Sequence, residues 1–357
     1  MRQAETTFLG RRLHNQRLTR SELRPSTELR AGRPADVVAW LGAVQAQDYP
    51  AAKWALGLRA PGLTDDDVEQ AFTEGRILRT HVLRPTWHFV TPADIRWMLA
   101  LTGPRVNNCN IRNFRRLGLT DAVLKRVRVV FERALRGGRH LTRADLAAAL
   151  RTAGIQVEGQ ALAHVMMNAE LEGVVCSGAR QGKQPTYALL EERVPRGRII
   201  TRDEALGELT RRYFSSHGPA TLGDFVWWSG LIVADARRGI EIAGAALERR
   251  AIAAGAYWSA AAGPGPRASR AATAHLLPNY DEYLVAYRER GGGDIFAHSL
   301  VIDGRVAGTW TKAPRQGAVT VNVASTRRLT PAERRAVAAA AERYGRFLQQ
   351  PVICVQR

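Results

Sequence analysis

The order of predicted helices and strands constrains the fold of this chain most, because one arrangement occurs three times. In the first occurrence, apolar residues in 35–44 recur at the spacing of a buried helix face, and two shorter helices follow, the last capped by Thr64. Residues 77–90 then contain two β-prone runs, which we predict to form a hairpin. The predicted helices cover residues 35–44, 51–58 and 68–74. Three helices followed by a hairpin is the plan of a winged helix.

The same arrangement returns twice farther along the chain. Thr142 is the predicted cap of one helix, and a hairpin with a glycine-rich, basic tip is predicted over residues 174–189. The third occurrence ends in a short run through Tyr257, beyond which residues 276–326 contain short strands. A helix capped by Thr330 and a closing strand complete the chain. The remaining predicted elements cover residues 160–172, 203–214, 222–229, 234–243, 330–348 and 352–355.

These segments predict a mainly α protein with β-hairpins, of the α+β class. We expect three tandem winged helix-turn-helix units and a small C-terminal β-rich α+β region, which together form a concave basic surface. With 357 residues the chain is long for a single core, which agrees with several units. The predicted domains cover residues 1–104, 105–195, 196–262 and 263–357.

The charge of the chain favours an anionic partner, and nucleic acid is the first candidate. Lys and Arg number 52 against 33 Asp and Glu, which gives a net charge of +19. GC-rich coding would explain why arginine replaces lysine, but it does not explain the excess over acids. The strongest basic run lies in residues 105–143, where each arginine is either a phosphate contact or part of a solvated helix face. Its basic residues are Arg105, Arg112, Arg115, Arg116, Lys125, Arg126, Arg128, Arg133, Arg136, Arg139 and Arg143.

The cysteines and the chain ends indicate a protein of the reducing cytoplasm. Cys109, Cys176 and Cys354 are widely spaced and odd in number, so neither a disulfide framework nor a zinc site is indicated. We expect no metal and no cofactor. The first residues have no apolar signal segment, and no charge-free run reaches membrane-spanning length. No heptad run offers a dimerisation element, so we expect a cytoplasmic, nucleoid-associated monomer that does not bind membranes.

Gln45 and Gln47 form the most informative local motif. In an extended or turning backbone, residues two apart point to the same side, so the two carboxamides can converge on one water molecule. Pro50 follows, and we predict that a helix ends at the motif and that residues 45–49 line a cleft. Such a triplet alone is a weak signal, and its setting decides its meaning.

Three longer segments together resemble a known enzyme family. VQAQDYPAAKWALGLR at residues 44–59, THVLRPTWHFV at 80–90 and LLPNYDEYLVAYRER at 276–290 look like the AlkZ/YcaQ family of bacterial winged-helix DNA glycosylases. The YcaQ branch has Asp at the position of Gln47, so the chain resembles the AlkZ branch. The resemblance implies a monofunctional glycosylase for N7-alkylated purines, including guanines in interstrand crosslinks, that acts in self-resistance to alkylating natural products. Its partner is then double-stranded DNA containing such lesions.

The chemistry of the motif agrees with this resemblance. Alkylation at N7 makes the base a cationic leaving group, so no general acid is needed, and the remaining task is to place water and tolerate an oxocarbenium-like centre. We assign Gln45 and Gln47 to water positioning and transition-state stabilisation. Asp48 is either a helper or, as we favour, a structural residue at a helix C-terminus. A neutral damaged base should be cleaved poorly.

Further residues are candidates for DNA contact. His81 and His88 of the predicted hairpin are either phosphate or sugar ligands or scaffold elements, whereas Arg84 at its bend is the better phosphate ligand. Asp281 either orients groups near the cleft or begins a helix. In a later hairpin over residues 310–320, two cations at the tip are expected to enter a DNA groove. The full set of predicted DNA-binding residues is His81, Arg84, Thr86, His88, Asp281, Lys312 and Arg315.

Two features limit this interpretation and leave other classes open. Aromatic residues make up only 7% of the chain, so we expect an open concave surface without a large pocket for a flipped base. Winged helices mostly belong to transcription factors, so a non-catalytic DNA-binding regulator is the alternative. An RNA-binding or nucleoid-coating protein is a third class.

Overall fold

The computed structural model describes residues 2–19, 33–197, 199–252, 255–261 and 271–356. After an N-terminal helix α1 (Arg2–Asn15), the first unit has the order helix, strand, helix, helix, strand, strand. Its three-stranded sheet has the order β1-β3-β2, which is the topology expected of a winged helix. The elements are α2 (Pro34–Leu41), β1 (Val44–Gln45), α3 (Tyr49–Arg59), α4 (Asp65–Thr73), β2 (Leu78–Val82) and β3 (Arg84–Val90).

The second unit repeats this order, and its sheet order β4-β6-β5 is equivalent. Helix α5 (Pro92–Arg116) joins it to the first unit, and α9 (Leu190–Arg193) follows it. The elements are α6 (Asp121–Leu135), β4 (Leu141–Thr142), α7 (Arg143–Thr152), α8 (Gly159–Leu171), β5 (Val175–Ser177) and β6 (Thr186–Leu189).

The third unit has the same plan, with the first strand reduced to one bridge between Ala220 and Trp258. A two-stranded sheet forms its wing. The elements are α10 (Arg202–Ser216), α11 (Leu222–Ser229), α12 (Val233–Ala243), the short helix η1 (Gly244–Ala246), β7 (Leu247–Ile252) and β8 (Gly255–Ala260). The expectation of three recurring helix-and-hairpin units is therefore confirmed.

The C-terminal region is a five-stranded sheet packed against one long helix. Its strand order is β13-β12-β11-β10-β9, in which only the β12–β13 pair is parallel. The elements are β9 (Ala274–Leu277), α13 (Glu282–Val285), β10 (Ser299–Ile302), β11 (Arg305–Arg315), β12 (Ala318–Ser325), α14 (Pro331–Phe347) and β13 (Val352–Gln356). The predicted α+β character of this region is correct.

Helix starts follow local chemistry that the sequence displays. In each capping box, a threonine hydroxyl accepts from the backbone N–H three residues on, and the acid at that position accepts from the threonine N–H. In the described part of the chain five helices begin in this way, and the boxes are Thr64 with Asp67, Thr142 with Asp145, Thr201 with Glu204, Thr221 with Asp224 and Thr330 with Glu333. The predicted caps at Thr64, Thr142 and Thr330 are confirmed.

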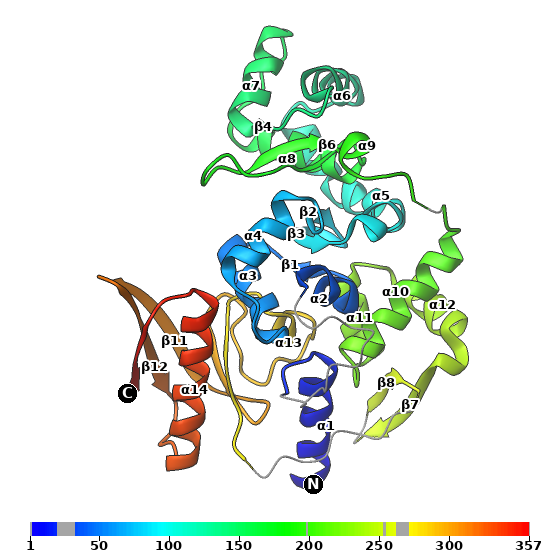
Figure 1. Ribbon diagram of the computed structural model, residues 1–357. Helices are drawn as coiled ribbons and strands as arrows, with labels where there is room; N and C mark the ends of the chain where they lie inside the picture. The colour runs from blue at the N-terminus through cyan, green and yellow to red at the C-terminus, as the bar shows by residue number, and fades with distance from the viewer. Residues whose placement is uncertain (1, 20–32, 198, 253–254, 262–270, 357) are drawn as a thin grey trace.

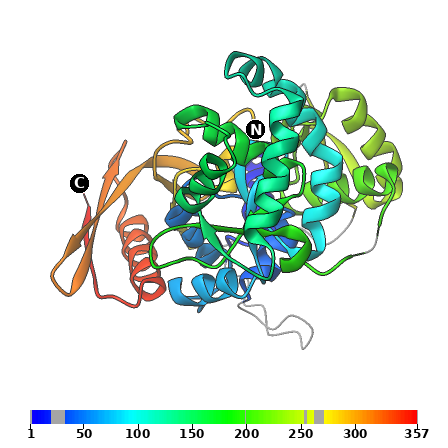
Figure 2. The same cartoon turned by 90° about the horizontal axis from the view of Figure 1, so that it is seen from above.

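The first unit lies at the centre of the molecule, between the other parts (Figure 1). Its helices share a hydrophobic core with the C-terminal sheet, where the ring centroid of Trp54 lies 4.9 Å from that of Tyr344. Its hairpin shares a second core with the third unit, and the second unit has a third core of its own. Seen from above, the C-terminal hairpin projects to one side of the rest (Figure 2). None of the helices in the described ranges is both long and apolar enough to cross a membrane.

The predicted domain limits fall at different kinds of position. The limit at 104/105 lies inside α5, whose first half packs in the second core and whose second half packs in the third. The limit at 195/196 follows α9, and that at 262/263 lies outside the described residues. The division into four domains therefore stays a proposal.

Candidate active site

Gln45 lies in a short strand, not at a helix end as predicted. Helix α2 ends at Leu41 because Gly42 adopts a φ of 85°, a conformation that favours glycine. The chain then enters β1, where Gln45 pairs with His88 of β3. The expectation of an extended backbone at the motif is correct, and its expected place at a helix C-terminus is wrong.

The Gln45 side chain is buried and held by a cation. Only 5% of the residue is exposed, and its Oε1 accepts a hydrogen bond of 2.7 Å from Nη2 of Arg84. Arg84 is the first residue of β3, because the hairpin turns one residue earlier, at Leu83 with a φ of 64°. A carbonyl oxygen has two lone pairs, so the Arg84 bond leaves one acceptor site on Gln45.

Gln47 is exposed and lies beside the same strand. Its Oε1 is 3.4 Å from the backbone nitrogen of Trp87, which donates to it. Between the glutamines, Ala46 is fully buried and its N–H donates to the Trp87 carbonyl over 2.7 Å. Arg79 donates to the carbonyl oxygens of Ala46 and Gln47 over 2.9 and 3.4 Å. Strand β3 and Arg79 thus fix the backbone that carries both carboxamides.

Asp48 begins a helix, which corrects its predicted place at a helix end. Its Oδ1 accepts from the Ala51 nitrogen over 3.1 Å, so it is the N-cap of α3. Its Oδ2 accepts from Nδ2 of Asn279 over 3.2 Å. The structural interpretation of Asp48 is therefore right in kind, and the residue also ties the motif to the segment before α13.

Glu282 is a buried carboxylate behind Gln45 that the sequence interpretation missed. Its Oε1 accepts from the Gln45 nitrogen over 2.7 Å, and its Oε2 accepts from Nε1 of Trp228 over 2.9 Å. Nε2 of His217 lies 3.4 Å from the same Oε2. Burial alone would raise the pKa of Glu282, but the contacts with His217 and the Gln45 N–H lower it overall. Glu282 of α13 therefore places a buried negative charge between Gln45 of the first unit and Trp228 and His217 of the third unit.

Asp281 is a scaffold residue, which corrects its prediction as a DNA contact. It is 1% exposed and forms two hydrogen bonds of 2.7 and 2.8 Å with the guanidinium of Arg59. It also caps α13 by accepting from the Tyr283 nitrogen over 2.8 Å, as its alternative interpretation expected. Arg59 donates to Gln16, which in turn donates to the Glu282 carbonyl. This buried network fixes the position of Glu282.

Both predicted histidines are buried and bonded within the protein, as their alternative interpretation as scaffold elements expected. His88 is fully buried, and its Nδ1 lies 2.9 Å from the Thr86 carbonyl. Burial, together with the charge of Arg84, lowers the pKa of His88 to about 3, so its ring is neutral near pH 7. Thr86 is half-buried, and its hydroxyl has no hydrogen-bond partner within the described residues.

His81 connects the first unit to the second. It is 6% exposed and bonded through Nδ1 to Glu170 of α8, a carboxylate that is 1% exposed. The other oxygen of Glu170 accepts from Nε1 of Trp87 over 3.3 Å, and the rings of His81 and Trp87 are 4.4 Å apart. One acid of the second unit thus holds two side chains of the hairpin that carries Arg84.

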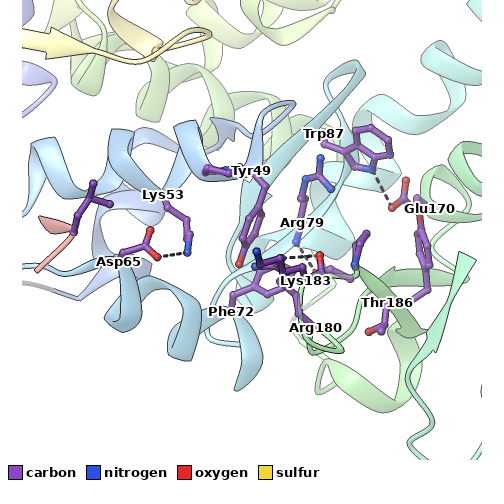
Figure 3. A pocket seen from close by; sticks show the side chains of 15 residues that line it. Tyr49, Lys53, Asp65, Phe72, Arg79, Trp87, Glu170, Arg180, Lys183 and Thr186 are labelled. Atoms are coloured by element: carbon purple, nitrogen blue, oxygen red, sulfur yellow. Dashed lines mark hydrogen bonds and ion pairs between the residues drawn. The ribbon is translucent and has the colours of Figure 1, made fainter. Parts of the chain in front are cut away.

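A pocket of about 460 Å³ opens next to Tyr49, between the first unit, the second unit and the end of α14 (Figure 3). Its lining includes Tyr49, Arg79 and Trp87, all next to the motif or bonded to it. The low aromatic content of the chain did not predict this pocket, because several of the few aromatic side chains are concentrated here. The expectation that the protein has no large pocket for a flipped base stays a prediction. Within the described ranges, His, Cys, Asp and Glu form no group of three or more that could hold a metal ion.

Comparisons with known proteins agree on one family. Residues 38–347 match the family described as "DNA glycosylase AlkZ-like". The chain belongs to the AlkZ-like DNA glycosylase family. A curated relative, "Interstrand DNA cross-link repair glycosylase" of Streptomyces sahachiroi, is 25% identical over 226 residues, which span 60% of this chain and 59% of that protein. The solved structure of "Streptomyces sahachiroi DNA glycosylase AlkZ" has the same fold, with a TM-score of 0.73, 21% identity and coverage of 98% and 99% of the two chains.

In this AlkZ-like chain the two predicted cations of the late hairpin are exposed. Lys312 and Arg315 lie near the end of β11, next to the turn into β12, on the hairpin that projects at the left of Figure 1. Nζ of Lys312 is 5.8 Å from the ring centroid of Tyr344. The hairpin is confirmed, and its contact with DNA stays a prediction.

The basic run of the AlkZ-like chain lies on α5, on α6, in the loop after α6 and at the start of α7. All of its cationic residues are exposed except Arg143, which is half-buried. Arg128 pairs with Glu132 over 2.8 Å, whereas Arg112, Arg115 and Lys125 have no salt-bridge partner among the described residues. The arrangement leaves a charged surface that suits phosphates.

Proposed function

We propose that this AlkZ-like chain is a monofunctional DNA glycosylase that hydrolyses the N-glycosidic bond of N7-alkylated purines. We also propose that it unhooks interstrand crosslinks made by an alkylating natural product, as the printed name of its Streptomyces relative suggests for that protein. The observation that carries the proposal is the holding of Gln45 between Arg84 and Glu282, beside exposed Gln47. Its partner is duplex DNA, on which it acts as a cytoplasmic monomer in self-resistance.

The proposed chemistry relies on the charge that the lesion already carries. An N7-alkylated purine departs as a neutral base when its bond to C1′ breaks, so the enzyme needs no proton donor. Gln47 is open to solvent and can accept a hydrogen bond from the attacking water. The free lone pair of Gln45 directs a partial negative charge at the cationic sugar, and Arg84 fixes its orientation. Neutral damaged bases lack this leaving group and should be excised poorly.

The buried charges near Gln45 add to this arrangement. Glu282 is held as an anion by His217 and the Gln45 N–H, so a negative charge lies directly behind the motif. Charges interact more strongly in a protein interior than in water because the dielectric constant there is lower. Glu282 can therefore favour the positively charged transition state without touching the substrate.

The experiment that tests the proposal is excision of 7-methylguanine from a duplex. We expect the natural chain to leave alkali-labile sites, seen as strand breaks after heating, under single-turnover conditions. Gln45→Ala and Gln47→Ala should each slow excision by about 10–1,000-fold, as loss of a transition-state hydrogen bond does elsewhere. Gln70→Ala is the matched control, because Gln70 is an exposed glutamine bonded only to Glu74 among the described residues.

The competing function is a DNA-binding regulator without catalysis, which three winged-helix units would also suit. That alternative is favoured if the natural chain produces no breaks and if both glutamine variants bind DNA as the natural chain does. Excision by all three variants at the natural rate would instead keep the glycosylase and remove the glutamines from its mechanism.

A further inference from the structure

A tryptophan of the third unit, Trp227 on α11, contacts two arginines close to Gln45. The residue is 38% exposed, and its Nε1 donates to the Val285 carbonyl over 2.9 Å, so the ring is fixed in place. The guanidinium carbon of Arg84 lies 5.5 Å from the ring centroid, and that of Arg290 lies 5.2 Å from it. One ring therefore contacts a cation of the first unit and a cation of the segment after α13.

Both arginines have donors that no part of the described chain accepts. Arg84 donates to Gln45 through Nη2, and Arg290 has neither a hydrogen-bond partner nor a salt-bridge partner among the described residues. The Nε atoms of both are buried, whereas the other unpaired nitrogens, Nη1 of Arg84 and both Nη atoms of Arg290, are open to solvent. The site can therefore donate several hydrogen bonds to one ligand that carries acceptor oxygens.

The charges around the two arginines favour an anion as that ligand. Burial lowers the pKa of Arg84, the charge of Glu282 opposes this effect, and the charge of Arg290 adds to it. Glu282 is fully buried and already accepts from Gln45 and Trp228. No carboxylate of the described ranges lies within 4.0 Å of either guanidinium. Two guanidiniums that repel each other in a partly buried place are suited to one shared anion.

The end of α11 connects this pair of arginines to the basic run on α5. Gly230 has a φ of 68° and lies so close to the first unit that a Cβ there would clash with the Leu83 carbonyl oxygen and lie 3.4 Å from Cγ of Arg84. The Gly230 carbonyl accepts from Nε of Arg105 over 2.6 Å. Arg105 is exposed and is the first residue of the basic run. Positive charge therefore continues from Arg290 and Arg84 onto α5.

We propose that Arg84 and Arg290 together bind one phosphate of the damaged strand, beside the nucleotide whose base is excised, and that Trp227 sets the spacing of the two guanidiniums. The proposal rests on the proposed function, and it includes the predicted phosphate contact of Arg84. Because the Arg84 guanidinium also holds Oε1 of Gln45, the bound phosphate fixes the direction of that carboxamide. Arg290 is thereby a DNA-binding residue, and Arg84 couples DNA binding to the position of Gln45.

The first test removes one phosphate charge at a time and measures binding. Each duplex contains tetrahydrofuran, a stable abasic-site analogue, and one methylphosphonate in place of a phosphate near it on the same strand. We expect one or two positions beside the analogue to weaken binding of the natural chain by about tenfold, as loss of a charge-assisted hydrogen bond does. In Arg290→Gln the same methylphosphonate should cost less than about twofold, because a cation that contacts this phosphate is already gone.

Arg335→Gln is the matched control, because Arg335 is exposed on α14 and the change removes the same charge. This variant should keep the full response at the same positions. A scan in which no position responds, or a full response in Arg290→Gln, would overturn the proposal.

The second test measures the coupling to Gln45 by excision of 7-methylguanine at saturating protein, where differences in affinity no longer affect the rate. The responsive methylphosphonate should slow the natural chain by about tenfold and Gln45→Ala by far less, because that variant has no carboxamide to position. Equal slowing of both chains would refute the coupling.

The binding test needs no excision, so it separates this proposal from the proposed function. A chain that excises 7-methylguanine but shows no responsive position refutes the phosphate site and leaves the glycosylase standing. A chain that shows a responsive position, loses it in Arg290→Gln and excises nothing refutes the glycosylase and supports the phosphate site.

Discussion

Replacing Glu282 with glutamine removes the negative charge behind Gln45 with little change in side-chain shape, and so tests what that charge contributes. The two carboxylate oxygens accept from different donors, the Gln45 nitrogen at 2.7 Å and Nε1 of Trp228 at 2.9 Å. A glutamine has only one acceptor oxygen, so one of these N–H groups must face an NH₂ group. The lost bond to a charged acceptor costs about 2 kcal/mol, and the buried donor left unpaired adds to this.

If Glu282 acts by positioning Gln45, losing this hydrogen bond should also raise the activation free energy of excision by a similar amount. A change of about 2 kcal/mol in the barrier corresponds to a rate roughly 30-fold lower. The assays are urea unfolding followed by circular dichroism and single-turnover excision of 7-methylguanine. Glu289→Gln is the control, because Glu289 is exposed in the same segment.

A double variant distinguishes a positioning role from general loss of stability. If Glu282 acts by positioning Gln45, Glu282→Gln should cost far less activity when Gln45→Ala is already present, because the backbone N–H that Glu282 holds no longer carries a carboxamide, whereas a direct effect of its charge on the cationic sugar would persist. The reasoning is refuted if Glu282→Gln unfolds and excises like Glu289→Gln. Full additivity of the two changes would separately refute action through Gln45.

Three other perturbations follow from the structure. Among the described residues neither ring nitrogen of buried His275 has a hydrogen-bond partner, and burial lowers its pKa to about 3. The unfolded chain binds a proton at this histidine below about pH 6.5, so the fold loses stability as the pH falls from 6.5 toward 3, and His275→Leu should unfold at lower pH in an acid titration. Gly57→Ala would place a methyl group 2.5 Å from the Phe347 ring and should cost about 1–3 kcal/mol in urea unfolding, whereas an unchanged midpoint would show that α14 shifts freely. Lys312→Ala with Arg315→Ala should weaken duplex binding and lower its salt slope by about 2, and unchanged excision would show that this hairpin does not probe DNA.

Sequence reasoning succeeded where the cause of a structure is local. Thr64 and Thr142 begin helices because the acid three residues on completes each capping box, and both partners are visible in the sequence. The β2–β3 hairpin was recognisable from its β-prone runs, although its turn lies at Leu83 and not at Arg84. That shift of one residue matters, because it places Arg84 in the strand, facing Gln45.

The candidate site was predicted less completely, because its contacts join distant segments. Glu282 lies 237 positions from Gln45, and nothing in the DEY sequence says which of its two acids reaches the motif. The sequence predicts a DNA contact for Asp281, which instead pairs with Arg59 in the interior. For the histidines the sequence left a DNA contact and a scaffold role open, and the full burial of His88, which favours the scaffold role, arises only in the folded protein.

Glu170, the single acid on α8, couples the second unit to the β2–β3 hairpin that lies beside Gln45 and Gln47. Glu170 forms hydrogen bonds with both His81 and Trp87, and the Trp87 backbone N–H in turn donates to the Gln47 carboxamide. If DNA binding tilts the second unit, either these two hydrogen bonds break or the strand that carries Trp87 moves with it. Under the proposed function, movement of the second unit on DNA would therefore change the position of the Gln47 carboxamide.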